Sequence, residues 1–183
     1  MHLPINIADL LQARTVESER LEFKAGWNPE AVLHTLCAFA NDFHNWGGGY
    51  ILIGVAEKDG VPVLPPTGLP ATRLDQIQKE LLALGHRMIP HYHPIVSPCE
   101  IQGRQVLVLW ACGGQTRPYK APTSLSKDCR EYAYYIRKGT TTVRAKQQDE
   151  SELRSLAATV PFDDRSHHTA ALGDLDLGLI RSY

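Results

Sequence analysis

Basic residues and tyrosines alternate within one short stretch of the chain, and these side chain types together suit contact with a polyanion. The residues are Tyr132, Tyr134, Tyr135, Arg137, Lys138, Arg144 and Lys146. Arginine and lysine contact phosphate oxygens and aromatic rings stack on bases, so the combination predicts nucleic-acid binding. A solvated strand face with its tyrosines in the core would carry the same residues, and the pattern alone leaves both interpretations open.

A further cation lies earlier in the chain, in the segment Arg20-Leu-Glu-Phe-Lys24. Alternation of apolar and charged side chains with a period of two is typical of a half-buried strand. Lys24 follows Glu22 by two residues, so both side chains belong to one strand face, where Lys24 could contact phosphate. The alternative is a solvated ion pair between Glu22 and Lys24, which contributes little.

Three consecutive glycines, Gly47 to Gly49, separate a predicted helix from a predicted strand. A phosphate-binding loop runs instead from strand into helix, and needs a GxxxxGK sequence followed by serine or threonine, which this chain lacks. The glycines therefore favour a tight corner over an ATP site. Asn41, just before them, is expected to cap the helix end or to bind the strand backbone through its amide.

The elements that must position these residues follow from hydrophobic periodicity. Helices are predicted over residues 29–44, 73–86 and 149–158, and strands over residues 20–24, 50–56, 95–101, 105–111, 131–137 and 140–144. The run Tyr50–Ala56 is continuously β-prone, which indicates a central strand covered on both faces. We expect an α+β fold with a mixed, largely antiparallel sheet flanked by the helices at residues 29–44 and 73–86.

The composition is that of a globular protein, with 183 residues, 43% of them hydrophobic and 21% charged. The net charge of −1 provides no global attraction to nucleic acid, so any binding requires a local basic patch. The chain has no apolar run of roughly 18 residues and no signal peptide pattern, so we expect a cytoplasmic protein that does not enter a membrane. The four cysteines and eight histidines match no zinc template, which favours free thiols and surface histidines.

Residues 1–158 are expected to form one domain. After Val160 and Pro161 the sequence becomes polar and irregular before an apolar periodicity resumes. We therefore expect residues 159–183 to be a linker and the start of a truncated following region.

Five sequence blocks, taken in their order along the chain, carry a family resemblance. They are Glu17–Lys24, Ala38–Asn41, Gly47–Val55, Ile89-Pro90 and Tyr135–Thr141. This set resembles the Schlafen-AlbA type domain of bacterial and archaeal regulators, formerly classified as a divergent AAA domain, over about residues 10–158. The glycine run alone would be a weak signal, whereas the combined order of blocks is specific.

The resemblance implies a nucleic-acid-binding regulatory module, with DNA favoured over RNA, in a homodimeric transcriptional regulator. ATP binding often accompanies descriptions of the family, although this chain lacks the loop that would hold phosphate. The contacts that we expect with nucleic acid are Lys24, Arg137, Lys138, Arg144 and Lys146.

Two alternative functions stay open. Eukaryotic Schlafen proteins cut RNA with three carboxylates, and the resemblance carries the first two onto Glu17 and Glu22 and the third onto Glu57 or Asp59. Such carboxylates could hold Mg²⁺ or Mn²⁺ as the cofactor of an endoribonuclease, but Ala56-Glu57 replaces the aspartate expected directly after Gly-Val. The third possibility is a protein-interaction or oligomerisation domain, which the weak net charge allows.

Overall fold

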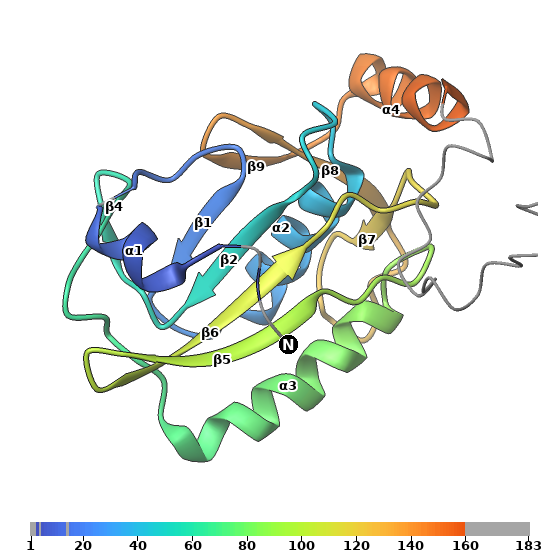
Figure 1. The fold of residues 1–183 in the computed structure, drawn as a ribbon. Coiled ribbons are helices and arrows are strands. Elements are labelled where there is room, and N and C mark those ends of the chain that lie inside the picture. The colour runs from blue at the N-terminus through green and yellow to red at the C-terminus, as the bar shows by residue number, and fades with distance from the viewer. Residues whose placement is uncertain (1–2, 4, 14, 160–183) are drawn as a thin grey trace, which may run out of the picture.

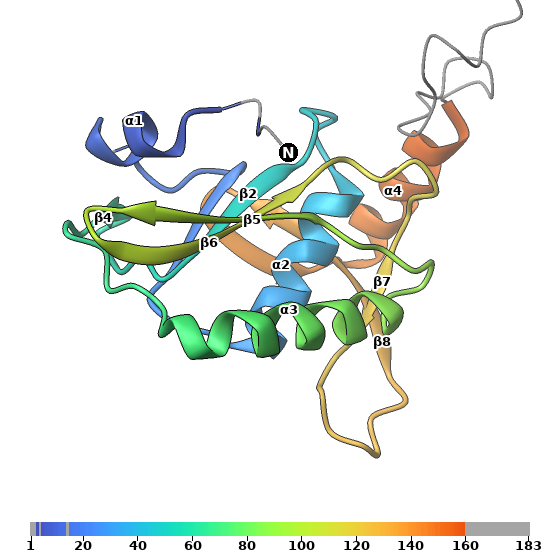
Figure 2. The ribbon, with the colours of Figure 1, turned by 60° about the horizontal axis from the view of Figure 1, so that its bottom comes forward.

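A central helix, α2 (Pro29–Asn41), lies between two β-sheets (Figures 1 and 2). The computed structural model describes residues 3, 5–13 and 15–159. The larger sheet has the order β1-β2-β6-β5, and the smaller sheet has the order β7-β8-β9. Part of the expected linker and following region, residues 160–183, lies outside the described residues.

The larger sheet is mixed and largely antiparallel, as the sequence predicts. Its strands are β1 (Leu21–Lys24), β2 (Gly49–Ile53), β5 (Ile95–Ile101) and β6 (Arg104–Ala111). Strand β1 pairs with β2 in parallel, whereas the β2–β6 and β5–β6 pairs are antiparallel. A small hairpin, β3 (Glu57–Lys58) and β4 (Val61–Pro62), follows β2.

Both faces of the larger sheet are covered. Ile51 and Ile53 pack with α2 and with α3 (Ala71–His86), while Tyr50 and Leu52 pack with the short helix α1 (Ile7–Gln12) on the opposite face. Every residue of β2 is buried, which confirms the prediction of a central strand. Among the described residues, none of the helices has the length and apolar character needed to cross a membrane.

The smaller sheet covers the other side of α2. It consists of β7 (Lys120–Pro122), β8 (Tyr132–Lys138) and β9 (Thr141–Arg144), all antiparallel, and is followed by α4 (Gln147–Thr159). Residues of β7 and β8 share one core cluster with α2 and the larger sheet. The predicted elements therefore all form, but the two C-terminal strands belong to a separate sheet.

Helix α2 begins at the predicted residue and ends before the predicted one. The Asn28 side chain accepts a hydrogen bond from the Ala31 amide at 3.1 Å, and Pro29 occupies the first turn. The helix ends at Asp42 in a left-handed conformation, earlier than predicted. The corner that follows requires glycine, because Gly48 has a φ of +79° and a Cβ there would lie 1.9 Å from the Ala111 carbonyl oxygen.

Asn41 joins α2 to the smaller sheet, as the sequence allows. Its fully buried amide donates to the carbonyl oxygens of Tyr119 and Tyr135, at 3.0 and 2.8 Å, and accepts from the Tyr119 amide at 2.6 Å. Buried backbone groups without partners are costly, so this one side chain satisfies polar groups that no strand partner reaches.

We predict that Asn41→Ala lowers the free energy of unfolding by about 3 kcal/mol, because it leaves buried backbone groups unpaired. Urea denaturation measures the change. The matched control is Gln76→Ala, which removes an exposed amide bonded only to Glu80 and is expected to have little effect. Equal effects of the two substitutions would contradict the assigned role of Asn41.

Candidate nucleic-acid interface

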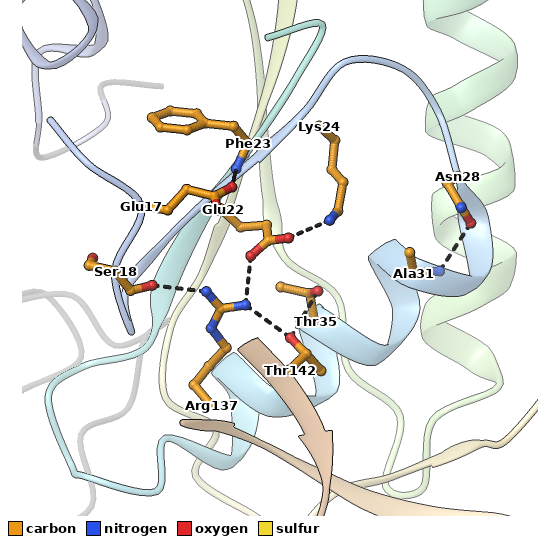
Figure 3. Close-up of polar contacts among 10 residues, drawn as sticks. All are labelled: Glu17, Ser18, Glu22, Phe23, Lys24, Asn28, Ala31, Thr35, Arg137 and Thr142. Atoms are coloured by element: carbon orange, nitrogen blue, oxygen red, sulfur yellow. Dashed lines mark hydrogen bonds and ion pairs between the residues drawn. The ribbon is translucent and has the colours of Figure 1, made fainter. Parts of the chain in front are cut away.

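A buried ion pair connects the two sheets where the predicted site residues meet. The Arg137 Nη1 on β8 lies 2.6 Å from the Glu22 Oε2 on β1, and these side chains are only 4% and 8% exposed (Figure 3). Arg137 also donates to the Thr142 hydroxyl at 3.0 Å and to the Ser18 carbonyl oxygen at 2.9 Å. The guanidinium therefore holds β1, β9 and the segment before β1 together.

The second oxygen of Glu22 is also paired. Lys24, on the same face of β1, donates to Glu22 Oε1, and its side chain is 28% exposed. The sequence predicted that Lys24 and Glu22 share a face, and the structure confirms it. Glu22 is thus neutralised by two cations, of which Lys24 is the one that reaches the surface.

Glu17 lies close enough to Glu22 and to Glu57 for their charges to act on it. The Glu17 Oε1 accepts from the Phe23 amide at 2.8 Å, and the Glu57 Oε2 accepts from the Gly60 amide at 2.7 Å in the β3–β4 turn. Burial raises the pKa of Glu17; the Phe23 amide opposes this rise, and the negative charges of Glu22 and Glu57 add to it.

This arrangement does not fit a bound Mg²⁺ or Mn²⁺. No group of three histidine, cysteine, aspartate or glutamate side chains in the described part of the chain is arranged to hold a metal ion. Glu22, the central member of the proposed set, already has a cation on each oxygen, and a metal would compete with both. Asp59, the alternative third ligand, is an exposed turn residue with a φ of +55°.

Arg137, which the sequence analysis expects to contact nucleic acid, has a structural role here. Its Nη atoms are buried against Glu22, Thr142 and Ser18, so they hold neighbouring elements and do not face a phosphate. Of the two interpretations that the sequence left open for the tyrosines, the structure supports a core position for two of them. Tyr134 and Tyr135 are buried, and the Tyr135 ring stacks on His34 with centroids 4.1 Å apart.

The remaining predicted cations divide between two faces of the β8–β9 hairpin. Lys138 pairs with Thr141 and Tyr135 pairs with Arg144 in the strand register, and adjacent positions alternate between faces. Arg144 therefore shares the Tyr135 face, where it forms an exposed ion pair with Glu131 at 2.6 Å. Lys138 lies on the opposite face, so these cations do not form one patch.

Asp149, in the first turn of α4, binds one lysine side chain and one backbone amide. The Lys138 Nζ lies 2.8 Å from the Asp149 Oδ1, and the backbone amide of Lys146 donates to the other Asp149 oxygen at 2.9 Å. The Lys138 hydrogen bond lowers the pKa of Asp149, and the Lys146 amide and the charges of both lysines lower it further. The Lys146 side chain is exposed and forms no ion pair within the described part of the chain.

Arg20 is a cation that the sequence analysis did not select. It is exposed, and its Nε donates to the Gly48 carbonyl oxygen at 3.0 Å. The sequence could have identified Arg20 from its spacing. Arg20, Glu22 and Lys24 are two residues apart, so the polar face of the strand continues back to Arg20.

Comparisons with known proteins agree with this architecture. A family model described as Schlafen, AlbA_2 matches residues 17–146. The chain belongs to this family. The match to the Schlafen, AlbA_2 domain includes Glu17, the glycine corner and the β8–β9 hairpin, and it confirms the family resemblance found in the sequence. The comparison with curated proteins found no match.

One solved structure shares the fold of this Schlafen, AlbA_2 domain, and a second is similar at a lower score. The DIP2311 protein from Corynebacterium diphtheriae is 20% identical with a TM-score of 0.51, and the alignment covers 89% of this chain and 28% of that protein. The N-terminal domain of a RecG-related protein from Nitrosomonas europaea is 24% identical with a TM-score of 0.47, covering 62% of this chain and 74% of that domain. The chain thus spans less than a third of the length of the Corynebacterium protein.

We predict that Arg137→Met destabilises the fold by about 3–5 kcal/mol, because it leaves the buried Glu22 carboxylate without its main partner. Adding Glu22→Leu should restore part of this loss, which gives a large coupling in a double-mutant cycle. The control is the exposed pair, Arg144→Met with Glu131→Leu, whose coupling should stay below about 1 kcal/mol. A buried pair that couples no more strongly than the exposed pair would contradict the assignment.

We also predict that Glu17→Gln stabilises the protein at neutral pH. Because the pKa of Glu17 is raised in the folded state, folding favours its protonated form, and this contribution is lost as the pH rises through the folded pKa. The amide oxygen of glutamine can still accept from Phe23. Denaturation at pH 7 should therefore show an advantage for the variant, which disappears below the carboxylate pKa range; a constant difference at both pH values would disprove the assignment.

Proposed function

We propose that the domain is a nucleic-acid-binding module of a transcriptional regulator, with DNA favoured over RNA. Membership of the Schlafen, AlbA_2 family suggests a nucleic-acid-related domain. The resemblance to bacterial regulators supports the regulatory role, a homodimeric assembly and a cytoplasmic location. The proposal assigns residues 1–158 to this module and residues 159–183 to a linker and the start of a following region.

The observation that carries the proposal is that two exposed lysines, Lys138 and Lys146, lie near one carboxylate, Asp149, with which Lys138 forms the ion pair. One carboxylate cannot neutralise two lysines, so a local excess of positive charge exists although the whole chain carries −1. The Lys138 side chain is 53% exposed, so it can reach a phosphate, while Asp149 keeps its hydrogen bond from the Lys146 backbone amide.

Further exposed cations lie near β1, on the other side of the contact between Glu22 and Arg137. Lys24 reaches solvent beside Glu22. Arg20 is exposed and lies two residues before Glu22, in step with the alternation of charged and apolar residues. Arg144 adds an exposed cation on the other hairpin face. We propose Lys24, Lys138, Arg144 and Lys146 as phosphate contacts, with Arg137 holding the strands that carry them.

The endoribonuclease hypothesis receives less support from the site. The charges of Glu22 and Glu57 act on Glu17, but both oxygens of Glu22 are held by cations. ATP stays outside the proposal, because the glycine segment forms a corner in the wrong order for phosphate binding. Nucleic-acid binding requires neither a catalytic metal ion nor ATP.

We predict that Lys138→Ala with Lys146→Ala weakens binding to labelled duplex DNA and reduces the slope of log affinity against log salt by about 1.5. The reason is that each lost phosphate contact removes about 0.7–0.9 from that slope. Fluorescence anisotropy over a series of salt concentrations measures both effects, and labelled RNA tested in parallel determines the preferred nucleic acid.

The charge-matched control is Arg73→Ala with Lys79→Ala on α3. It removes the same charge from another element, so it should change the affinity far less. Absence of DNA and RNA binding by the unaltered protein at low salt would refute the proposed function. An equal loss in both double variants would mean that the α4 side of the hairpin is not the contact surface.

A further inference from the structure

A small open hollow, with about 20 Å³ of space accessible to water, lies beside the buried ion pair and next to the glycine corner. Its lining residues come from the segment before β1, from α2, from the corner and from β8. Those that matter here are Glu19, Arg20, Asp42, His44, Trp46 and Arg137. A space of this size holds about one water molecule, so it admits a polar atom at the edge of a ring and not the ring itself.

An aromatic pair forms the rim of this hollow. The rings of His44 and Trp46 stack with centroids 4.9 Å apart and an angle of 30° between their planes. Trp46 is 54% exposed, an unusual state for a large aromatic side chain. A flat exposed ring is a platform on which another flat ring can stack.

The backbone holds this pair rigidly at the corner. The Asp42 carboxylate accepts from the amides of Trp46 and Gly47, each at 2.9 Å. Arg117 donates to the Asp42 carbonyl oxygen at 3.2 Å and to the Asn45 side chain at 2.6 Å. A ligand that stacks on Trp46 therefore needs little additional ordering of the loop.

The hollow also offers both donors and acceptors. The buried Arg137 Nε has no hydrogen-bond partner in the described part of the chain, and a buried donor without a partner calls for an explanation. Arg20 supplies further guanidinium donors, because only its Nε is bonded to Gly48. The carboxylates of Glu19 and Asp42 also line the hollow; the Glu19 Oε1 accepts from the Gly139 amide at 3.0 Å and each Asp42 oxygen accepts one amide, and each of these oxygens has a second lone pair as a further acceptor. Phosphate presents only acceptors, whereas the edge of a base presents donors and acceptors together.

We propose that the His44–Trp46 pair stacks an unpaired nucleobase of a single DNA strand, and that the adjacent hollow contacts the edge of that base. This inference rests on the proposed function and adds a strand preference to it. A base in a duplex is already stacked and paired, so its face and its pairing edge are not accessible. The site therefore favours single-stranded over duplex DNA.

The test compares binding of a labelled single strand of about twelve nucleotides, a typical site size, with binding of the matching duplex. Trp46→Leu should weaken single-strand binding about tenfold, because stacking on one aromatic ring contributes on that order. Duplex binding should change little. Trp46→Phe, which keeps a ring, should retain most of the single-strand affinity, and abasic sites in the strand should reduce the affinity of the unaltered protein.

The control variant is Leu82→Ala, which removes a similarly exposed apolar side chain from α3 and should leave both affinities unchanged. Thermal unfolding checks that each variant folds. If Trp46→Leu binds single strands as tightly as the unaltered protein, the stacking site is overturned while the proposed function stands. If the unaltered protein binds neither single strands nor duplexes at low salt, the proposed function itself fails, and the stacking site fails with it.

Discussion

The buried ion pair between Glu22 and Arg137 is the constraint on which the arrangement of this domain depends. It joins strands separated by 115 positions in the sequence and belonging to different sheets. Two charges removed from water are tolerated only when they are close and their other hydrogen-bonding atoms are satisfied. Ser18, Thr142 and Lys24 supply most of those bonds. The relative position of the two sheets is therefore tied to one guanidinium and one carboxylate.

This constraint also organises the surface around it. Because the Arg137 side chain is ion-paired with Glu22, the cations that can bind a polyanion are the exposed ones on β1 and on the β8–β9 hairpin. Because Arg137 keeps one unpaired Nε, the hollow under Trp46 has a buried donor. In the proposed complex, the cations that pair with phosphate and the Trp46 ring that stacks on a base would thus lie in neighbouring places on the surface. The weak net charge of the chain conceals this local distribution, in which two exposed lysines lie near the single carboxylate of Asp149.

Local patterns predicted most of the elements. The apolar run of β2 indicated a strand covered on both faces, and Asn28 with Pro29 indicated the start of α2. Asn41 was assigned to the helix end or to the strand backbone, and it binds the backbone on both sides of the β7–β8 connection. The separation of the strands into two sheets was not predicted, because pairing depends on contacts between distant segments. The sequence could have predicted that Lys138 and Arg144 lie on opposite faces of the hairpin, because successive residues of a strand alternate between its two faces.

The sequence by itself determined the family, the order of the elements and the glycine corner, because each depends on residues close together in the chain. Only the tertiary structure decided what each charged side chain does. Arg137 and Lys138 are adjacent in the sequence and of the same charge type, yet one is buried as a connector and the other is exposed. The physical reason is that the role of a charge depends on its partner and its burial, and the partner that buries Arg137 comes from a segment 115 positions away in the chain.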